Sequence, residues 1–381
     1  MEEWKLYKLS DVTNLIGDGI HGTPKYDDSG SYFFINGNNL ENGKIVIRST
    51  TKKVNTEEAL KHRKSLSERT ILVSINGTIG NTARYNFEPC ILGKSACYLN
   101  VSDGVDVDFI YYVVSNQQFK DTITRLATGT TIKNVSLETM RNYEFLMPSL
   151  KSQKKISGIL KSIDDKIELN RQINDNLEQQ ASSILSDWTS TYPCRTYKLS
   201  DICKYVSAKC DTGNLTSQNY ISTENMLPNK KGIVDASNIP TGKVTCFKVD
   251  DILIANIRPY FQKIWKADTS GGCSTDVLCI RSCVESHSPI LYWILHQDAF
   301  FEYVMTGAKG CKMPRGDKQH IMNWTIDLPE PDYWADIATQ LGAVDQRIAY
   351  NRIESNNLSN LRDTLLPKLM SGELKINEID C

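Results

Sequence analysis

The sequence predicts an α+β protein built as a tandem repeat, in which each of two domains is followed by a long helix. Three observations support this fold class. The letters YKLSD occur at Tyr7–Asp11 and again at Tyr197–Asp201. Residues 153–185 align without a gap to residues 334–366 at a constant offset of 181, and nine of the 33 positions are identical. Both aligned segments have the apolar spacing of a helix. The expected boundaries are residues 1–148 and 191–331 for the two domains, and residues 149–190 and 332–381 for the two helices, the second with a short C-terminal tail.

The two domains are expected to be mixed and rich in strands. Apolar and β-branched residues form short runs that are bounded by Gly, Asn and Asp. In the first domain, runs at residues 32–36, 70–75 and 97–101 precede an amphipathic helix near residues 108–126. In the second domain, runs at 251–257 and 277–280 precede a similar helix near 288–305. At 381 residues the chain is also too long for one ordinary core.

Both long helices carry a heptad seam, because apolar residues alternate steps of three and four. The first seam contains Ile156, Leu160, Ile163, Ile167, Asn170 and Leu177, and the second contains Ile337, Leu341, Val344, Ile348, Asn351 and Leu358. One interpretation is that the seams pack against each other, since a seam of ~36 residues runs ~54 Å, longer than a small domain can cover. The alternative is that each stripe packs on its own domain. Asn170 and Asn351 would fix the register of a pair, or would be solvated breaks.

Patterns that would indicate catalysis are incomplete. Gly37–Lys44 has one residue too many for a nucleotide-binding P-loop, and Asn256–Tyr260 reads NIRPY instead of the NPPY motif of amino-methyltransferases. The five histidines are isolated, so no Ser/His/Asp or metal constellation is expected. The eleven cysteines include no CxxC pair, which argues against zinc, and they are expected to be reduced. No catalytic residue and no metal ligand is predicted.

Charge and hydropathy exclude two further classes of protein. The net charge of −1 argues against nonspecific coating of nucleic acid but leaves room for a local basic groove. No apolar run approaches the ~20 residues that span a bilayer, and the N-terminus has no signal pattern, so a cytoplasmic location without membrane contact is expected.

Basic side chains gather on two stretches of the second domain. Residues 258–266 and 309–318 combine cations with Gly, Pro and aromatic residues, a composition that suits phosphate contact and groove reading. Core packing is expected for the aromatic residues Phe261 and Trp265, and a solvated surface is the alternative for the cations. In the first domain, glycine-rich polar turns offer weaker candidates that would also fit plain turn chemistry. The DNA-binding candidates are Thr23, Lys25, Thr78, Arg84, Thr130, Lys133, Arg258, Tyr260, Lys263, Lys309, Lys312, Arg315 and Lys318. Arg258 and Arg315 are favoured for base edges, since a guanidinium pairs bidentately with guanine.

The order of these motifs resembles that of the specificity subunits of type I restriction-modification systems. The resemblance extends over nearly the whole chain: YKLSD opens each domain, ILVSINGTIG and ILIANIRPYFQKIW follow the midpoints, and TGTTIKNVS and GCKMPRGDK precede the helices. The helix repeat beginning QKKISGILKSIDDKIELNRQIN and the closing KLMSGEL also fit.

The resemblance implies a non-catalytic subunit of pseudo-twofold form, in which an antiparallel, coiled-coil pair of helices separates two target recognition domains. It implies double-stranded DNA as a partner, with each domain reading one half of a split target and the helices setting the spacer. It further implies two methyltransferase subunits and restriction subunits as partners. No cofactor is then expected on this chain, while S-adenosylmethionine, ATP and Mg²⁺ belong to the partner subunits.

Two departures from the family pattern concern the second helix. Arg362 places a charge in the seam, and residues 329–334 (PEPDYW) lack the EEQ-like run usual in the family, which puts the start of that helix in doubt. Two other functions remain open from the residues themselves: a coiled-coil scaffold without a DNA role, and a stand-alone nucleic-acid-modifying enzyme.

Overall fold

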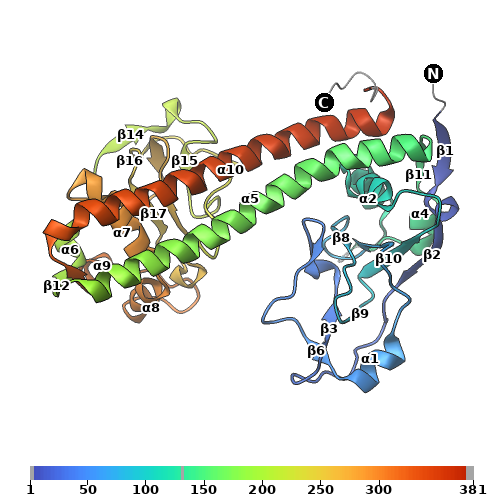
Figure 1. Cartoon of the computed structure of the whole chain (residues 1–381), viewed down its shortest axis with the longest axis horizontal. Helices are drawn as coiled ribbons and strands as arrows, with labels where there is room; N and C mark the ends of the chain where they lie inside the picture. Colours follow the sequence, from blue (N-terminus) through green and yellow to red (C-terminus); the bar gives the residue numbers. More distant parts are fainter. Residues whose placement is uncertain (1–3, 130–132, 375–381) are drawn as a thin grey trace. The chain divides into compact units, whose positions relative to one another are not determined.

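The computed structural model describes residues 4–129 and 133–374, which form two compact units. Unit 1 comprises Met1–Ile167 and Asn356–Cys381, and unit 2 comprises Glu168–Ser355. Both long helices, α5 (Leu150–Thr191) and α10 (Trp334–Ser371), contribute to both units. The α+β class and the two long helices are therefore as predicted, but each compact unit includes part of both helices (Figure 1).

Unit 1 is built on a four-stranded antiparallel sheet. Its strand order is β2 (Thr13–Asp18), β10 (Ala96–Val101), β7 (Thr70–Ser74) and β8 (Thr82–Arg84). Beside it lie a second sheet, β6 (Lys53–Val54), β3 (Tyr32–Ile35) and β9 (Cys90–Leu92), and two ribbons, β1 (Lys5–Lys8) with β11 (Glu144–Met147) and β4 (Leu40–Glu41) with β5 (Lys44–Ile45). The shorter helices are α1 (Thr56–His62), α2 (Val107–Ser115), α3 (Gln117–Leu126) and α4 (Leu137–Arg141).

Unit 2 repeats this plan. Its main sheet has the equivalent order β13 (Cys203–Tyr205), β20 (Val277–Ser282), β17 (Ile252–Ala255) and β18 (Ile264–Lys266). The second sheet is β14 (Lys209–Asp211), β16 (Lys243–Phe247), β19 (Gly271–Cys273) and β15 (Tyr220–Ile221), and β12 (Cys194–Lys198) pairs with β21 (Thr325–Pro329). The shorter helices are α6 (Leu199–Ile202), α7 (Ser288–Leu295), α8 (Asp298–Thr306) and α9 (Lys318–Met322).

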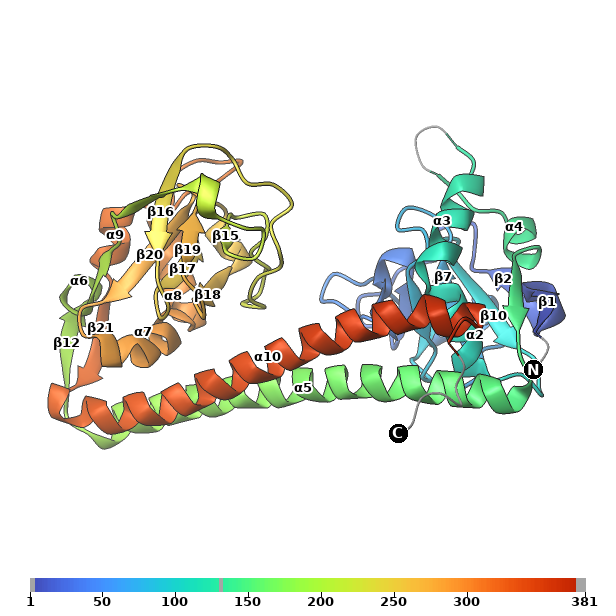
Figure 2. The ribbon, with the colours of Figure 1, turned by 90° about the horizontal axis from the view of Figure 1, so that it is seen from above.

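The central strand of each main sheet is covered on both faces. In unit 1, Ile71 and Val73 pack with residues of α2 and α3 on one face, while Leu72 packs with residues of β3 and β9 on the other. Figure 2 shows the helices beside the strands in this unit. In unit 2, Ile252 likewise packs with residues of the helices on one face, and Leu253 packs with residues of the second sheet on the other. Burial on both faces explains why these strands are continuous apolar runs.

Each domain helix expected from the sequence is in fact two helices. The segment near 108–126 is interrupted at Asn116, whose extended backbone ends α2 and whose side chain accepts a hydrogen bond from the Phe119 amide at the start of α3. The segment near 288–305 is interrupted at the equivalent Gln297, which is also extended. The prediction of one helix was wrong because apolar periodicity continues across a short break, whereas an extended residue interrupts the ladder of backbone hydrogen bonds.

The seams pack both on each other and on the domains. In unit 1, Ile156 and Leu160 of α5 share a core with Leu366 and Leu369 of α10 and with the domain. In unit 2, Ile337, Leu341 and Val344 of α10 join Ala181, Leu185 and Trp188 of α5 in the domain core. The two interpretations of the stripes are therefore not exclusive, because helix segments in each unit contact both each other and the adjacent domain.

A polar contact in unit 2 holds α5 and α10 in antiparallel register. Asn170 and Asn351, the equivalent seam residues, are both fully buried. The Asn351 amide donates to Asn174 Oδ1 at 2.8 Å, and the Asn170 amide donates to a Glu354 carboxylate oxygen at 2.7 Å. Among the described residues, the Oδ1 atoms of Asn170 and Asn351 have no hydrogen-bond partner. Burial rules out a solvated break. The amide hydrogen bonds between the helices favour this register over others, while the unpaired buried oxygens lower the stability.

Both long helices begin with a hydrogen bond from a side chain to the carbonyl of a preceding proline. At the start of α5, the Gln153 side-chain amide donates to the Pro148 carbonyl at 2.9 Å. At the start of α10, the indole of Trp334 donates to the equivalent Pro329 carbonyl at 2.7 Å. Trp334 therefore replaces the glutamine expected from the family pattern, which settles the helix start that the sequence left in doubt.

Candidate nucleic-acid interface

In unit 2, the two basic stretches lie side by side. The turn between β17 and β18 spans residues 256–263, and the loop before α9 is a hairpin closed by two backbone hydrogen bonds of 2.9 Å between Lys309 and Arg315. Ile257 and Arg315 form a β-bridge, and the Arg258 amide donates to the Pro314 carbonyl at 2.7 Å. These backbone contacts join the turn and the hairpin into one surface, which we call loop pair 2.

Unit 1 has the same arrangement at an offset of 181 residues. Thr128 and Asn134 exchange backbone hydrogen bonds of 2.9 and 2.7 Å, at the positions equivalent to Lys309 and Arg315. Asn76 forms a β-bridge with Asn134, as the equivalent Ile257 does with Arg315. The turn after β7, residues 75–81, and the described residues 128–129 and 133–134 form loop pair 1. The repeat therefore extends beyond the helices to the loops that carry most of the candidate residues.

The cations of loop pair 2 differ in how firmly the protein holds them. Lys309 bonds Asp317 at 2.7 Å, and that contact together with backbone amides lowers the pKa of Asp317 to about 2. Arg315 pairs with Asp276 at 3.0 Å. The Lys263 ammonium donates to the Thr223 carbonyl at 2.6 Å, and partial burial lowers the pKa of Lys263.

Three further cations of the second domain are exposed. The ammonium of Lys318 lies 5.7 Å from the centre of the Tyr205 ring. The side chains of Arg258 and Lys312 have no hydrogen bond or ion pair with any residue that the structure describes. These two side chains are therefore the most available for an anionic ligand.

Apolar side chains are exposed among these cations. Tyr260, Phe261 and Met313 are 48%, 37% and 55% exposed, and the rings of Tyr260 and Phe261 are 4.6 Å apart. Trp265 is buried, as expected, whereas the expectation of core packing for Phe261 was wrong. The reason is the 3-10 turn η4 (Pro259–Phe261), which turns the chain away from the sheet before β18 begins. Exposed apolar residues beside cations suit base steps and sugars.

The candidates of the first domain are scattered. Thr23 and Lys25 are exposed on a loop outside loop pair 1, and Thr78 and Lys133 are exposed within it. Thr130 lies outside the described residues. Arg84 is half-buried and held by its neighbours: its Nε donates to Asp108 at 2.8 Å and its guanidinium lies 3.5 Å from the centre of the Tyr111 ring. We therefore leave Arg84 out of the candidate surface.

An anchor between helix and domain was missed by the sequence interpretation. In unit 1, Asp164 of α5 accepts a hydrogen bond from Tyr112 at 2.7 Å and from Arg362 at 2.8 Å. Arg362, the charge in the seam, thus has a partner. In unit 2, the equivalent Asp345 of α10 accepts from Trp293 at 2.7 Å and from Lys266 at 2.6 Å. Burial raises the pKa of Asp345. The identical Asp in both helix copies was the signal that could have revealed these anchors.

The described residues contain neither a candidate metal site nor a candidate membrane-spanning helix. Within residues 4–129 and 133–374, His, Cys, Asp and Glu side chains form no group of three that could hold a metal ion. In the same part of the chain, no helix is both long and apolar enough to cross a bilayer.

The known proteins that this chain resembles are specificity subunits of type I restriction-modification systems. Residues 1–179 match the model of the type I restriction modification DNA specificity domain. The type I restriction enzyme MjaIX specificity subunit of Methanocaldococcus jannaschii is 20% identical, over 99% of this chain and 95% of that protein. The type I restriction enzyme HindI specificity subunit of Haemophilus influenzae is 24% identical over 49% of this chain and 41% of its own length. The crystal structure of a type I restriction-modification S subunit from M. genitalium covers 97% of this chain and 96% of its own, with a TM-score of 0.58 and 20% identity, and has the same fold.

Proposed function

We propose that this chain is a specificity subunit of a type I restriction-modification system and that it reads a bipartite duplex DNA target with one loop pair for each half. The chain carries out no catalytic step of its own. Its contribution to the complex is recognition, and methylation and cleavage belong to other subunits.

The observation that carries this proposal is the equivalence of the two loop pairs. In both, β-bridges at positions 181 residues apart join the turn after a central strand to the segment that precedes a short helix. The backbone is the same, but the side chains differ: loop pair 1 presents glycine, hydroxyls and Lys133, and loop pair 2 presents cations and aromatic rings. One scaffold with two sets of side chains suits an asymmetric target, because base edges are read by side chains that a rigid scaffold presents.

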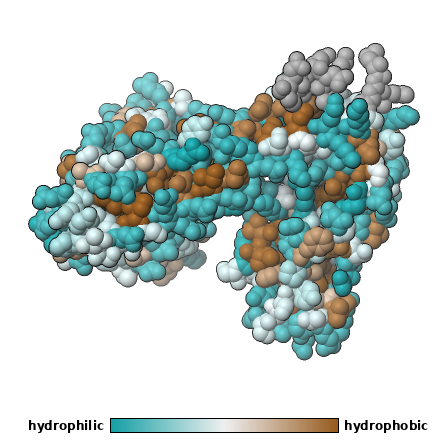
Figure 3. All heavy atoms as spheres, in the orientation of Figure 1, coloured by the Kyte–Doolittle hydropathy of each residue, from teal (hydrophilic) through white to brown (hydrophobic). Residues whose placement is uncertain are grey.

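The partners follow from this role. The complex would contain two methyltransferase subunits with S-adenosylmethionine, and restriction subunits that use ATP and Mg²⁺. Leu169 of α5 and Tyr350 of α10 are equivalent residues in unit 2 that expose 49% and 57% of their surface. Figure 3 shows hydrophobic side chains gathered along the helices of this unit. Two equivalent exposed apolar positions suit two copies of one partner.

The helices would act as a ruler for the unspecified spacer between the two halves of the target. Half-sites on one face of duplex DNA are separated by about one helical turn, ~34 Å. Packing of segments of both helices into each domain core supports a fixed attachment of each reader to the helix pair.

Adenine methylation provides the direct test. The chain is expressed with its methyltransferase subunits in cells that lack other adenine methylation, and methylated adenines are mapped. The expected result is a single split motif whose spacer tolerates any sequence. Methylation without a split motif, or independent of this chain, would contradict the proposal.

Charge reversal then locates the surface. Lys133→Glu in loop pair 1 and Lys312→Glu in loop pair 2 are each expected to weaken binding of the purified complex to the mapped site. Loss of one phosphate contact also reduces the slope of log K against log salt by about 1. Lys5→Glu, on the exposed strand β1, is the matched control. Equal losses in Lys312→Glu and Lys5→Glu would exclude loop pair 2 as the DNA surface.

A further inference from the structure

The turn between β17 and β18 contains two residues in an unfavourable backbone conformation. Arg258 (φ 52°, ψ 61°) and Gln262 (φ 50°, ψ 47°) are both left-handed and flank the 3-10 turn η4. A residue with a Cβ atom is disfavoured in this region, where glycine is the usual occupant. Such strain persists only where the surroundings impose it, and it is concentrated at functional sites.

The equivalent turn of unit 1 uses glycine at both places. Gly77 and Gly80 have φ values of 74° and 84°. The strand register aligns the two turns, because Val73 pairs with Thr82 in unit 1 and Ile254 pairs with Ile264 in unit 2. The turn of unit 2 is therefore one residue longer. Gly77 then corresponds to Arg258 and Gly80 to Gln262. Unit 2 therefore carries side chains where the same turn is built from glycine in unit 1.

Neighbouring segments hold the strained turn in place. The amides of Asn229 and Lys230 donate to the carbonyls of Phe261 and Gln262 at 2.8 and 2.9 Å. On the other side, the Arg258 amide donates to the Pro314 carbonyl of the hairpin at 2.7 Å. The backbone is thus fixed from two directions, and a change of side chain at Arg258 need not change its path.

The two strained residues differ in what their side chains do. Gln262 is half-buried, and its side chain faces Asp298, whose pKa is lowered by the Lys230 ammonium at 2.6 Å and, to a smaller extent, by the Gln262 amide. Arg258 is exposed, and its guanidinium has no hydrogen bond or ion pair with the described residues. A structural purpose is therefore visible for Gln262, whereas the side chain of Arg258 points to a ligand outside the chain.

We propose that Arg258 is a specificity-determining residue that reads one guanine in the half of the DNA target recognised by unit 2. This inference rests on the proposed function. A guanidinium donates two parallel hydrogen bonds to guanine O6 and N7, which a phosphate-binding point charge does not require. A rigid turn that fixes the Cα–Cβ direction of Arg258 provides the orientation that bidentate pairing needs.

The test uses the full chain with its methyltransferase subunits and maps methylated adenines for the wild type and three variants. Arg258→Lys keeps the charge but loses the bidentate fork, and Arg258→Gly also relieves the strain. Gln262→Gly is the matched control, because it relieves the backbone strain at the second left-handed residue and leaves the exposed Arg258 side chain unchanged. Thermal unfolding of each purified complex is measured in parallel.

We expect both Arg258 variants to lose discrimination at one base pair of one half-site by between about 5- and 150-fold, while the other half and the spacer stay unchanged. Arg258→Gly should unfold at the same temperature as the wild type or about 2 °C higher, because glycine is favoured at its φ. Gln262→Gly should keep the wild-type motif. Lost discrimination without lost stability is a result that a merely structural role of Arg258 does not produce.

Three results would overturn the inference. An unchanged motif in both Arg258 variants rejects base reading, while the proposed function stands. Uniformly weaker methylation with the same motif in Arg258→Gly, restored by lysine, assigns Arg258 to a phosphate instead. If the wild-type chain directs no split-motif methylation, the proposed function fails and this inference fails with it.

Discussion

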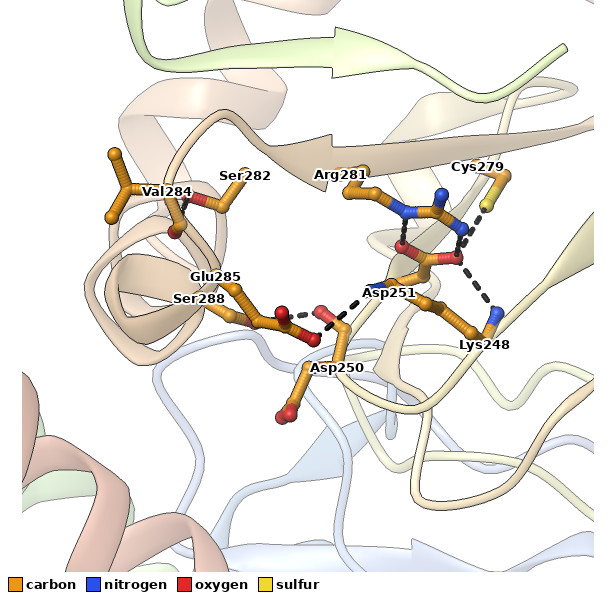
Figure 4. A network of polar contacts seen from close by, with 9 residues as sticks. All are labelled: Lys248, Asp250, Asp251, Cys279, Arg281, Ser282, Val284, Glu285 and Ser288. Atoms are coloured by element: carbon orange, nitrogen blue, oxygen red, sulfur yellow. Dashed lines mark hydrogen bonds and ion pairs between the residues drawn. The ribbon is translucent and has the colours of Figure 1, made fainter.

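Removal of the Asp251 carboxylate tests how the sheet that carries loop pair 2 is held together. Asp251 precedes β17 and is fully buried. Figure 4 shows its carboxylate facing Arg281 of β20: Nε and the terminal nitrogen of Arg281 each donate to it at 2.6 Å, and the Lys248 backbone amide donates at 2.8 Å. Asp251→Ala leaves both the guanidinium and the amide without this acceptor.

The magnitude follows from the burial of the groups that lose their partner. Removal of one partner of a buried ion pair destabilises by about 3–5 kcal/mol. The Arg281 side chain is 31% exposed and can reach water in part, so the lower end of that range applies. An amide that loses its acceptor costs about 1–3 kcal/mol, and the low end applies to Lys248 because this residue is exposed and its hydrogen bond is only partly buried. We expect a total loss of about 4 kcal/mol in the free energy of unfolding, which corresponds to a fall in Tm of about 8–16 °C.

Tryptophan fluorescence in urea is a suitable assay, because five of the six tryptophans lie in unit 2. Glu285→Ala is the control from the same network: Glu285 is 76% exposed and pairs with the Lys248 ammonium at 2.9 Å. A surface pair of this kind contributes about 0–1 kcal/mol. If Asp251→Ala and Glu285→Ala lose the same stability, the carboxylate does not hold the sheet and the reasoning is refuted.

Three other predictions concern the target, the spacer and pH. Exchange of residues 1–148 for another domain, with its contacts to Leu366 and Leu369 retained, should change one half of the mapped target, and a change in both halves would contradict independent reading. Insertion of one heptad in each long helix should lengthen the preferred spacer, and an unchanged spacer would reject the ruler. Burial lowers the pKa of His296 to about 3, so the unfolded chain binds more protons than the folded chain between that pH and 6.5. Stability therefore falls as the pH is lowered through this range, by up to about 1.4 kcal/mol per unit. In urea unfolding at pH 7.5 and pH 5, His296→Phe should lose less stability between the two pH values than the wild type does. An equal loss of stability in both proteins would show that His296 is not the source of the pH dependence.

Much of the architecture was predictable because the same pattern of residues occurs in both copies of the repeat. The offset of 181 residues located both helices, and apolar runs located β7, β10, β17 and β20. These patterns are local and redundant, so a single substitution such as Arg362 did not hide them. The resemblance to specificity subunits, which rested on the order of motifs along the whole chain, was confirmed by the family comparison.

The candidate site was predictable only in outline. Composition selected both stretches of loop pair 2, but the β-bridge between Ile257 and Arg315 that brings them together depends on how the chain returns to the sheet. Composition also failed to separate Arg84, which is held by Asp108 and Tyr111, from Arg258, which is unpaired among the described residues. The charge of an arginine is visible in the sequence, whereas its partners are set by residues distant along the chain.

The sequence by itself determined that this protein has two copies of one plan and that each copy ends in a long helix with an apolar stripe. Hydrophobic spacing suffices for this, because burial of a stripe depends on which residues recur along the helix and not on their exact neighbours. Only the tertiary structure decided which loops form a common surface and which side chains are available on it. Left-handed torsions at Arg258, hydrogen bonds across β-bridges and competing acidic partners arise from contacts between distant segments, and no local pattern encodes them.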